Sequence, residues 1–318
     1  MPEASVALQS VTVTVPGTTA NLGPGFDCLG AALTLYNRFQ FTLLDQAPGS
    51  YSIRVRGSEA ERVSRDSSNL AYRAFAHFYQ QQHQAVPAID LAIDLDVPLA
   101  RGLGSSSTAI VGGILAANAL YHQPLDQSSL VAMAVALEGH PDNVVPALVG
   151  GCQLSVVDDQ GLVTVCPVPW HASLGAIVVI PNFELATATA RQVLPLQYSR
   201  ADAIFNAAHL GLLLRGLETG NGDWLRVALA DRLHQPYRQS LIPGYGAVAA
   251  AAIAAGAHGL VISGAGPTLL ALAPATIAPQ VCEKLRVSWQ QQGQIVKAAV
   301  LPLQTRGAWV DANPIKGS

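Results

Sequence analysis

Hydrophobic and polar residues alternate along several short segments of the first hundred residues, and a period of two predicts β-strands. Valines alternate with threonines over 11–15, and the same period recurs over 39–43 and 51–55. The clearest example runs from Ile89 to Val97, where every second residue is a large apolar one. We expect this segment to form an antiparallel strand with one buried and one solvated face.

Two segments of the same region show helical spacing instead. Over 69–82 apolar residues recur every three or four positions, and Ser68 or Asn69 precedes them as a helix cap. The segment 109–121 is apolar on nearly every side, which predicts a buried helix.

In the second half of the chain, predicted strands and helices interleave. Strands are expected over 175–181, 260–263, 268–273 and 295–301, and helices over 202–217, 223–233, the stretch after Pro243, and 279–292. This order predicts an α+β fold with two layered domains. We place an N-terminal domain at 8–160, a C-terminal domain at 161–305 and a tail at 306–318, frayed from Asp311 onward. The boundary follows from the turn residues at 158–161.

Composition narrows the possible partners. The 318 residues have a formal net charge of −3, only 12% are charged, and lysines and arginines form no stripe, so we expect no nucleic-acid partner. The four cysteines lie far apart without a CxxC pair, which indicates reduced thiols in a cytosolic protein. The first ten residues lack the basic head and apolar core of a signal peptide.

The longest uncharged stretch, from Ala247 to Ala273, has the length of a membrane span. It contains His258 and a kink-prone turn at 263–267, and no basic flank orients it. A buried helix followed by a strand, a tight turn and a second strand is the better interpretation. We therefore expect no membrane partner and a cytoplasmic location.

The stretch at 97–110, VPLARGLGSSSTAI, combines a Gly-Leu-Gly step with three serines that open a helix. Glycines permit positive φ, and the free first-turn amides of a helix attract anions. The stretch lacks the lysine of a Walker loop, the third glycine of a dinucleotide fingerprint and the GxSxG of a hydrolase elbow. Two interpretations remain open here: a phosphate cradle, and a glycine turn with ordinary serine capping.

Three other stretches are rich in glycine, proline or polar groups. Pro16–Gly30 (PGTTANLGPGFDCLG) is long for a turn, although a tight connector with Asp27 capping a helix would also explain it. Glu138–Asn143 (EGHPDN) brings two carboxylates, an imidazole and an amide together, or caps a helix end. Ile262–Thr268 (ISGAGPT) is a second glycine-rich turn between strands.

Together, NLGPGFD, PLARGLGSSSTA, EGHPDN and ISGAGPT resemble, in this order, the motifs of the GHMP small-molecule kinases. NLGPGFDCLG with EGHPDNVVPALVGG is similar to the members that phosphorylate L-homoserine. The resemblance covers about residues 11–301. It implies an N-terminal domain like domain 2 of ribosomal protein S5, a ferredoxin-like C-terminal domain, and an active site between them. It also implies ATP, Mg²⁺, the product O-phospho-L-homoserine in threonine biosynthesis, and a homodimer.

The resemblance assigns residues to each part of this site. ATP contacts fall on Asn69 and on a loop made of Pro98, Leu99, Ala100, Arg101, Gly102, Leu103, Gly104, Ser105, Ser106 and Ser107. The resemblance implies that Ser106 and Glu138 are the Mg²⁺ ligands. Substrate contacts fall on Asn21, Asp27, His140, Thr187, Arg191 and Arg238, and catalytic positions on Glu138, Asn143 and Arg191.

Elementary chemistry agrees with an amino-acid substrate. A zwitterion needs an acid for its ammonium and a bidentate cation for its carboxylate, and Asp27 can serve the first need and Arg191 with Arg238 the second. No lysine lies in 11–30, and EGHPDN ends in Asn143 where some GHMP kinases place aspartate. The members that phosphorylate L-homoserine share this absence, which implies a hydroxyl activated by position and by the phosphate itself, without a dedicated base; Asp142 is the alternative base. Ala186 departs from the serine that the family often carries there.

Two alternatives remain open from the residues. The chain could be a GHMP kinase for another small alcohol, or a non-catalytic ligand sensor that keeps the fold. The intact Gly-Ser stretch with Glu138 favours catalysis, and Asp27 with the two arginines favours an amino acid.

Overall fold

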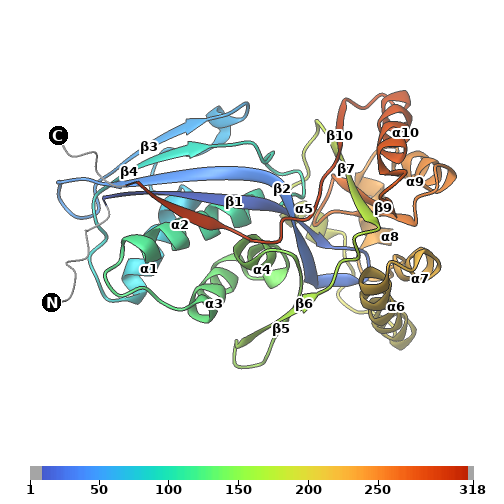
Figure 1. Cartoon of the computed structure of the whole chain (residues 1–318), viewed down its shortest axis with the longest axis horizontal. Helices are drawn as coiled ribbons and strands as arrows, with labels where there is room; N and C mark the ends of the chain where they lie inside the picture. The colour runs from blue at the N-terminus through green and yellow to red at the C-terminus, as the bar shows by residue number, and fades with distance from the viewer. Residues whose placement is uncertain (1–8, 314–318) are drawn as a thin grey trace.

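Residues 9–313 are described by the structure, a computed structural model in which two β-sheets lie next to each other, each covered by helices (Figure 1). The first sheet contains β1 (Ser10–Asn21), β2 (Gly25–Leu43), β3 (Tyr51–Arg56), β4 (Ile89–Asp94), β5 (Cys152–Val157), β6 (Val163–Val168) and β11 (Trp309–Asn313). Its strand order is β11-β1-β2-β4-β3, and the β5–β6 hairpin pairs with the first part of β2. The expected antiparallel pairing of the Ile89 strand is confirmed against β2, but β3 runs parallel to it and the strand ends at Asp94.

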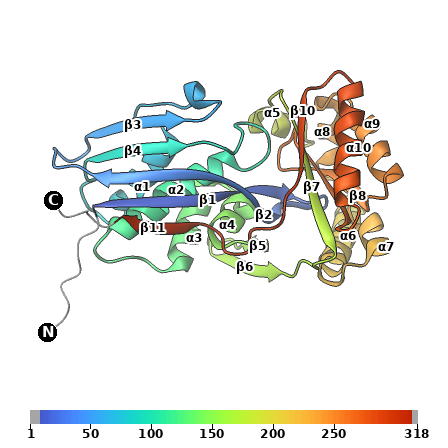
Figure 2. The ribbon, with the colours of Figure 1, turned by 45° about the horizontal axis from the view of Figure 1, so that its top comes forward.

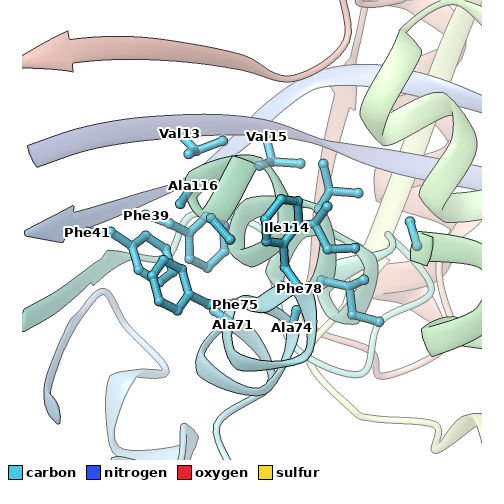
Figure 3. Close-up of a cluster of buried hydrophobic side chains, with 14 of the residues drawn as sticks. Val13, Val15, Phe39, Phe41, Ala71, Ala74, Phe75, Phe78, Ile114 and Ala116 are labelled. Carbon is cyan, nitrogen blue, oxygen red and sulfur yellow. The ribbon is translucent and has the colours of Figure 1, made fainter. Parts of the chain in front are cut away.

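Helices α1 (Leu70–Gln81), α2 (Ser105–Leu120), α3 (Gln127–Glu138) and α4 (Pro141–Val149) cover one face of this sheet. A short 3-10 turn, Ala60–Arg62, follows β3. Alternate residues of the central strands, such as Val13 and Phe41, pack against Phe75 and Ile114 from the helices (Figure 3). The predicted helices at 69–82 and 109–121 are thus confirmed, and α2 begins four residues earlier than its apolar run because the serines form its first turn.

The second sheet is fully antiparallel in the order β10-β7-β9-β8, with β7 (Leu174–Pro181), β8 (Gly259–Ile262), β9 (Leu269–Pro274) and β10 (Val296–Val300). Helices α9 (Tyr245–Ala254) and α10 (Ala278–Gln291) pack on one face through Ile177 and Val179 of β7. The other face meets α6 (Arg200–Thr219), α7 (Gly222–Ala228) and the β1–β2 turn in a core shared by the two sheets. The remaining short helices are α5 (Thr187–Gln192), α8 (Gln235–Arg238) and a 3-10 turn at Gln239–Leu241.

The stretch Pro16–Gly30 is not a separate loop. It forms the end of β1, a turn, and the start of β2, with register shifts that interrupt the ladder near Pro16 and Asn21. The alternative in which Asp27 caps a helix is wrong, because Asp27 lies inside β2 with φ +56°. Bulged backbone of this kind aims side chains away from the regular pleat, which lets Asn21 and Asp27 face a common cavity.

Three predicted boundaries also differ from the structure. The turn at 158–161 lies within the β5–β6 hairpin, so residues 163–168 belong to the first sheet and the second begins at Leu174. The predicted frayed tail contains β11, in which Val310 and Asp311 pair with Val13 and Thr12 (Figure 2). The end of that tail, 314–318, lies outside the described residues. The predicted helix at 223–233 stops at Ala228, because residues 231–234 form a turn around the carboxylate of Asp231.

The uncharged stretch 247–273 forms α9, β8, the turn and β9, as expected. Within 9–313, none of the helices combines the length and the apolar character that crossing a bilayer requires.

Candidate active site

A cavity of about 590 Å³ lies where the two sheets meet. Its lining comes from the loop before α2, the β1–β2 turn, the α3–α4 junction, α5, α8 and the β8–β9 turn. Sixteen of the predicted site residues line it: Asn21, Asp27, Asn69, Leu99, Ala100, Arg101, Gly102, Gly104, Ser105, Ser106, Glu138, His140, Asn143, Thr187, Arg191 and Arg238. The structure therefore brings together motifs that are separated by up to three quarters of the chain.

Three predicted residues are not part of this lining. Pro98 faces a smaller neighbouring cavity, and Leu103 is buried in the core shared by the two sheets. Ser107 is fully buried under the loop, although its hydroxyl reaches Glu138.

The Gly-Ser loop, residues 98–107, borders the cavity and leads into the N-terminus of α2. Ala100, Gly102 and Gly104 have positive φ, and Gly104 is the N-cap of α2. The first intrahelical bond runs from the Thr108 amide to the Gly104 carbonyl (2.9 Å), so the serine amides precede it. Unpaired amides at the positive end of a 16-residue helix form an anion site.

The carbonyl side of the same loop is tied to the rest of the protein. The Ala100, Arg101 and Leu103 carbonyls accept from the amides of Leu185, Thr268 and Thr18, and the Gly102 carbonyl accepts from the Ser263 hydroxyl. The Arg101 guanidinium donates to the carbonyls of Leu99, Pro181 and Asn182. The Arg101 side chain therefore fixes the loop, and an ATP contact at this position would use its backbone.

Glu138 accepts hydrogen bonds from two serines of the loop. Its Oε1 lies 2.9 Å from Ser106 Oγ and 3.0 Å from Ser107 Oγ. Glu138 is the last residue of α3, which ends because Gly139 takes the left-handed conformation (φ 89°). One carboxylate and hydroxyls beside an anion site fit Mg²⁺, which is usually held by one or two carboxylates together with substrate phosphates. Over residues 9–313 there is no group of three acidic, histidine or cysteine side chains that could hold a metal alone.

Asn69 lines the cavity and orients the residues on either side of it. Its Oδ1 accepts from the amides of Ala71 and Tyr72 as the cap of α1, and its Nδ2 donates to the Ser64 carbonyl (2.8 Å). The side chain thus shapes the segment 64–68 that lines this end of the cavity.

At the opposite end, Asp27 and Arg191 form a bidentate ion pair. Arg191 Nη2 and Nη1 lie 2.9 and 3.0 Å from Asp27 Oδ1 and Oδ2. The hydrogen bond to Asp27 raises the pKa of Arg191. Asn21 supports the pair: its Oδ1 accepts from the Asp27 amide, and its Nδ2 donates to the Gly264 carbonyl.

Arg238 is a buried cation in the same wall, 2% exposed. Its guanidinium donates to the carbonyls of Ala190 and Gly264 and lies 3.3 Å from Nδ1 of His234. Across the part of the chain that the structure describes, no carboxylate comes within 4.0 Å of it. Burial lowers the pKa of Arg238, and the nearby positive charge of Arg191 lowers it further. A desolvated cation of this kind favours an anionic ligand.

A chain of hydrogen bonds leads from Thr18, whose amide donates to the Leu103 carbonyl of the Gly-Ser loop, to His140 in the cavity lining. Thr18 Oγ1 donates to Asn143 Oδ1 (2.8 Å), and Asn143 Nδ2 donates to Asp142 Oδ1 (3.2 Å). His140 Nδ1 lies 2.8 Å from the same oxygen. This bond raises the pKa of His140 despite its burial.

Sequence reasoning missed several supporting residues. Thr18 and Phe26 lie in the stretch Pro16–Gly30 that was singled out, so their position was available but their partners were not. The Phe26 ring centroid lies 5.8 Å from Arg191 Cζ and 5.2 Å from Arg238 Cζ. Glu184 has no sequence signal: it pairs with Arg62, 122 residues away (2.6 Å), and with Arg101 (3.3 Å).

The fold and this cavity define the class of protein. The family model for the N-terminal domain of GHMP kinases matches residues 69–151, and the model for the C-terminal domain matches 213–290. The phosphomevalonate kinase of Streptococcus pneumoniae superposes with a TM-score of 0.69 at 16% identity, covering 93% of this chain and 99% of that one, which shows the shared fold. The chain is a small-molecule kinase of the GHMP class.

More similar proteins narrow the family. The homoserine kinase of Trichormus variabilis is 60% identical over 303 residues, which are 95% of this chain and 99% of that protein. The crystal structure of homoserine kinase from Cytophaga hutchinsonii superposes with a TM-score of 0.88 at 28% identity, covering 98% of this chain and all of that one. The chain belongs to the homoserine kinase family.

Proposed function

We propose that this enzyme transfers the γ-phosphoryl group of ATP to the hydroxyl of L-homoserine and forms O-phospho-L-homoserine, in threonine biosynthesis. One observation supports this most directly. A single cavity combines an anion-binding helix N-terminus with a carboxylate and two guanidinium groups, the charges that a phosphate donor and a zwitterionic acceptor require.

The nucleotide phosphates would lie against the amides of the Gly-Ser loop. The adenine ring would point toward the segment 64–68, which the Asn69 side chain supports. Because the loop carbonyls are bonded to other parts of the chain, the amides stay oriented without a ligand. Preorganised donors of this kind stabilise charge on the transferring phosphate more effectively than water does.

Ser106 and Glu138 would hold Mg²⁺, whose chemistry is to neutralise charge on the phosphate oxygens. The hydrogen bonds from Ser106 and Ser107 to Glu138 support this assignment, because they hold the carboxylate next to the first turn of α2. Glu138 is therefore proposed as a catalytic residue that acts through the metal.

At the acceptor end, Asp27 would bind the substrate ammonium, and Arg191 and Arg238 its carboxylate, with Asn21, His140 and Thr187 completing the contacts. Asn143, held by Thr18, would face the hydroxyl and the transferring group. Phosphoryl transfer depends on alignment and charge stabilisation, so the hydroxyl needs no dedicated base.

A coupled ADP-release assay with homoserine, mevalonate, galactose and no acceptor tests the proposal. We expect turnover with homoserine only. Turnover with homoserine equal to the blank would contradict the proposal, and turnover only with another alcohol would favour a different GHMP kinase. Binding of homoserine without ADP release would favour the ligand sensor.

Glu138→Gln tests the metal assignment. We expect the Mg²⁺ concentration for half-maximal rate to rise at least about tenfold, because a carboxylate charge next to a hard cation contributes more than ~1.4 kcal/mol. Glu218→Gln, an exposed partner of Arg215 far from the cavity lining, serves as the control. An unchanged Mg²⁺ dependence in Glu138→Gln would remove this residue from the metal site.

Two further expectations, a homodimer and a cytosolic location, rest on the family resemblance and on the cysteine distribution, and both remain predictions.

A further inference from the structure

The two groups expected to bind the opposite charges of the substrate are bonded to each other. Asp27 and Arg191 come from β2 and α5, 164 residues apart, and meet through two hydrogen bonds of 2.9 and 3.0 Å. Both line the cavity. Their side chains are 34% and 39% exposed, so the pair is open to a ligand from one side.

Among residues 9–313 the Arg191 guanidinium has no hydrogen-bond acceptor other than Asp27. Moving it away would leave two charges in a half-buried place where neither has another partner. Unpaired charges in such surroundings are unfavourable. A ligand that separates Asp27 from Arg191 must therefore supply each of them with a new partner of opposite charge.

Arg238 differs from Arg191 because it is a fixed cation. Its donors are oriented by the carbonyls of Ala190 and Gly264, and it forms no ion pair with Asp27 within 4.0 Å among the described residues. A carboxylate can therefore contact Arg238 while the Asp27–Arg191 pair stays closed. An ammonium has no such open partner: the carboxylate of Asp27 is already bonded to Arg191, and that of Asp142 is 2% exposed and contacts His140 and Asn143.

We propose that the Asp27–Arg191 pair is an internal substitute for the substrate zwitterion, and that L-homoserine binds by exchange of partners. The ammonium replaces Arg191 on Asp27, and the released Arg191 joins Arg238 on the carboxylate. No bond other than hydrogen bonds and ion pairs changes, and neither Asp27 nor Arg191 is left without a partner of opposite charge.

This exchange makes the pair a selectivity device against alcohols with a single charge. An ammonium alone must separate the pair and leave Arg191 without an anion. An alcohol with a carboxylate but no ammonium binds only Arg238, because binding Arg191 as well would leave Asp27 unpaired. The inference rests on the proposed function, since it concerns how the same site recognises its substrate.

The test is the affinity of 3-aminopropan-1-ol, which is homoserine without its carboxylate, for the wild type and for Arg191→Gln by calorimetry. Because Arg191 competes with the ammonium for Asp27, its removal should tighten 3-aminopropan-1-ol binding about threefold or more, while homoserine binding weakens. Arg191→Lys is the matched variant, because it keeps a competing cation and should bind 3-aminopropan-1-ol about as the wild type does.

The reciprocal measurement uses 4-hydroxybutanoate, which is homoserine without its ammonium. Asp27→Asn releases Arg191 and should bind this compound more tightly than the wild type, again with weaker homoserine binding. If Arg191→Gln binds 3-aminopropan-1-ol no better than the wild type, or if neither protein binds it, the exchange is contradicted.

The proposed function is checked separately by homoserine turnover in the wild type. Turnover without the expected gain in Arg191→Gln would overturn the exchange and leave the proposed function intact. Circular dichroism of each variant, with Arg215→Gln as an exposed control outside the cavity lining, shows whether the fold is retained.

Discussion

Thr18 is a buried residue that bonds the Gly-Ser loop to Asn143. Its amide donates to the Leu103 carbonyl of the Gly-Ser loop, and its hydroxyl donates to Asn143. The same hydroxyl lies against Gly104, where a Cβ would overlap it. One buried residue therefore sets the distance between the N-terminus of α2 and the amide of Asn143.

Thr18→Val removes the donor and keeps the shape of the side chain. We expect kcat to fall about three- to tenfold, since one hydrogen bond contributes ~1 kcal/mol, with a smaller change in KM for ATP. Thr18→Ser restores the hydroxyl and should recover most of the rate. Steady-state kinetics of the three proteins checks this, and equal rates in all three would mean that Asn143 needs no such support.

Gly104→Ala should damage both stability and nucleotide binding. A left-handed φ of +67° disfavours alanine by about 1–2 kcal/mol, and the added methyl would displace Thr18. Gly211→Ala is the matched control, because Gly211 lies within α6 with open space around its Cβ and should gain about 0.5–1 kcal/mol. Urea unfolding of both variants measures the difference, and similar changes in both would contradict it.

At the level of elements, the site is built from the ends of secondary structure. The Gly-Ser loop lies at the N-terminus of α2, Glu138 at the C-terminus of α3, and Thr187 and Arg191 on α5, a helix of six residues. Short helices have little stability of their own. The Leu185 amide bonds the segment before α5 to Ala100, and Glu184 adds ion pairs with Arg62 and Arg101, so α5 depends on the Gly-Ser loop and on Arg62 for its position.

Strand β11 completes the first sheet from the far end of the chain. It covers the outer edge of β1, and Trp309 packs edge-on against Tyr36 of β2 with ring centroids 5.5 Å apart. A chain that ends at Arg306 should lose this cover and melt about 5 °C lower or more. A chain that ends after Asn313 keeps β11 and serves as the control. Equal melting temperatures of the two shortened chains would contradict a stabilising role for β11.

In the whole molecule, the two sheets share one hydrophobic core below the active site. Leu22, Leu29 and Leu33 of the first sheet region pack with Val178 and Leu270 of the second. His234 adds a polar connection there: it is fully buried, donates from Nε2 to the Gly23 carbonyl (2.9 Å), and stacks on Phe26. The cavity geometry thus depends on how the two halves pack.

This connection predicts a pH dependence of stability. Burial lowers the pKa of His234, so the folded protein keeps it neutral while the unfolded chain takes up a proton below about pH 6.5. Stability from this group is therefore present above pH 6.5 and is lost as the pH falls. Between pH 7.5 and 5.5 the loss should be about 1 kcal/mol larger in the wild type than in His234→Gln, measured by urea unfolding. An equal loss in both proteins would contradict the neutral assignment.

The sequence by itself determined the local part of this protein. Periods of two and of three to four predicted most strands and helices because burial of one face repeats along the chain, and the glycine and proline motifs predicted the chemistry of the site because tight turns restrict residue choice. The family motifs assigned sixteen of the 29 residues that line the cavity.

Only the tertiary structure decided which of these residues meet. The Asp27–Arg191 pair, the cation Arg238 without a carboxylate partner among the described residues, and β11 on the edge of β1 join segments far apart in sequence. A local sequence pattern does not encode such partners, because the same residue type can stand at a position whether its side chain pairs with a distant residue or has no partner. Sheet order and the packing of the two halves bring these residues within hydrogen-bonding distance. The charged side chains of the site are therefore gathered in one cavity by the tertiary structure.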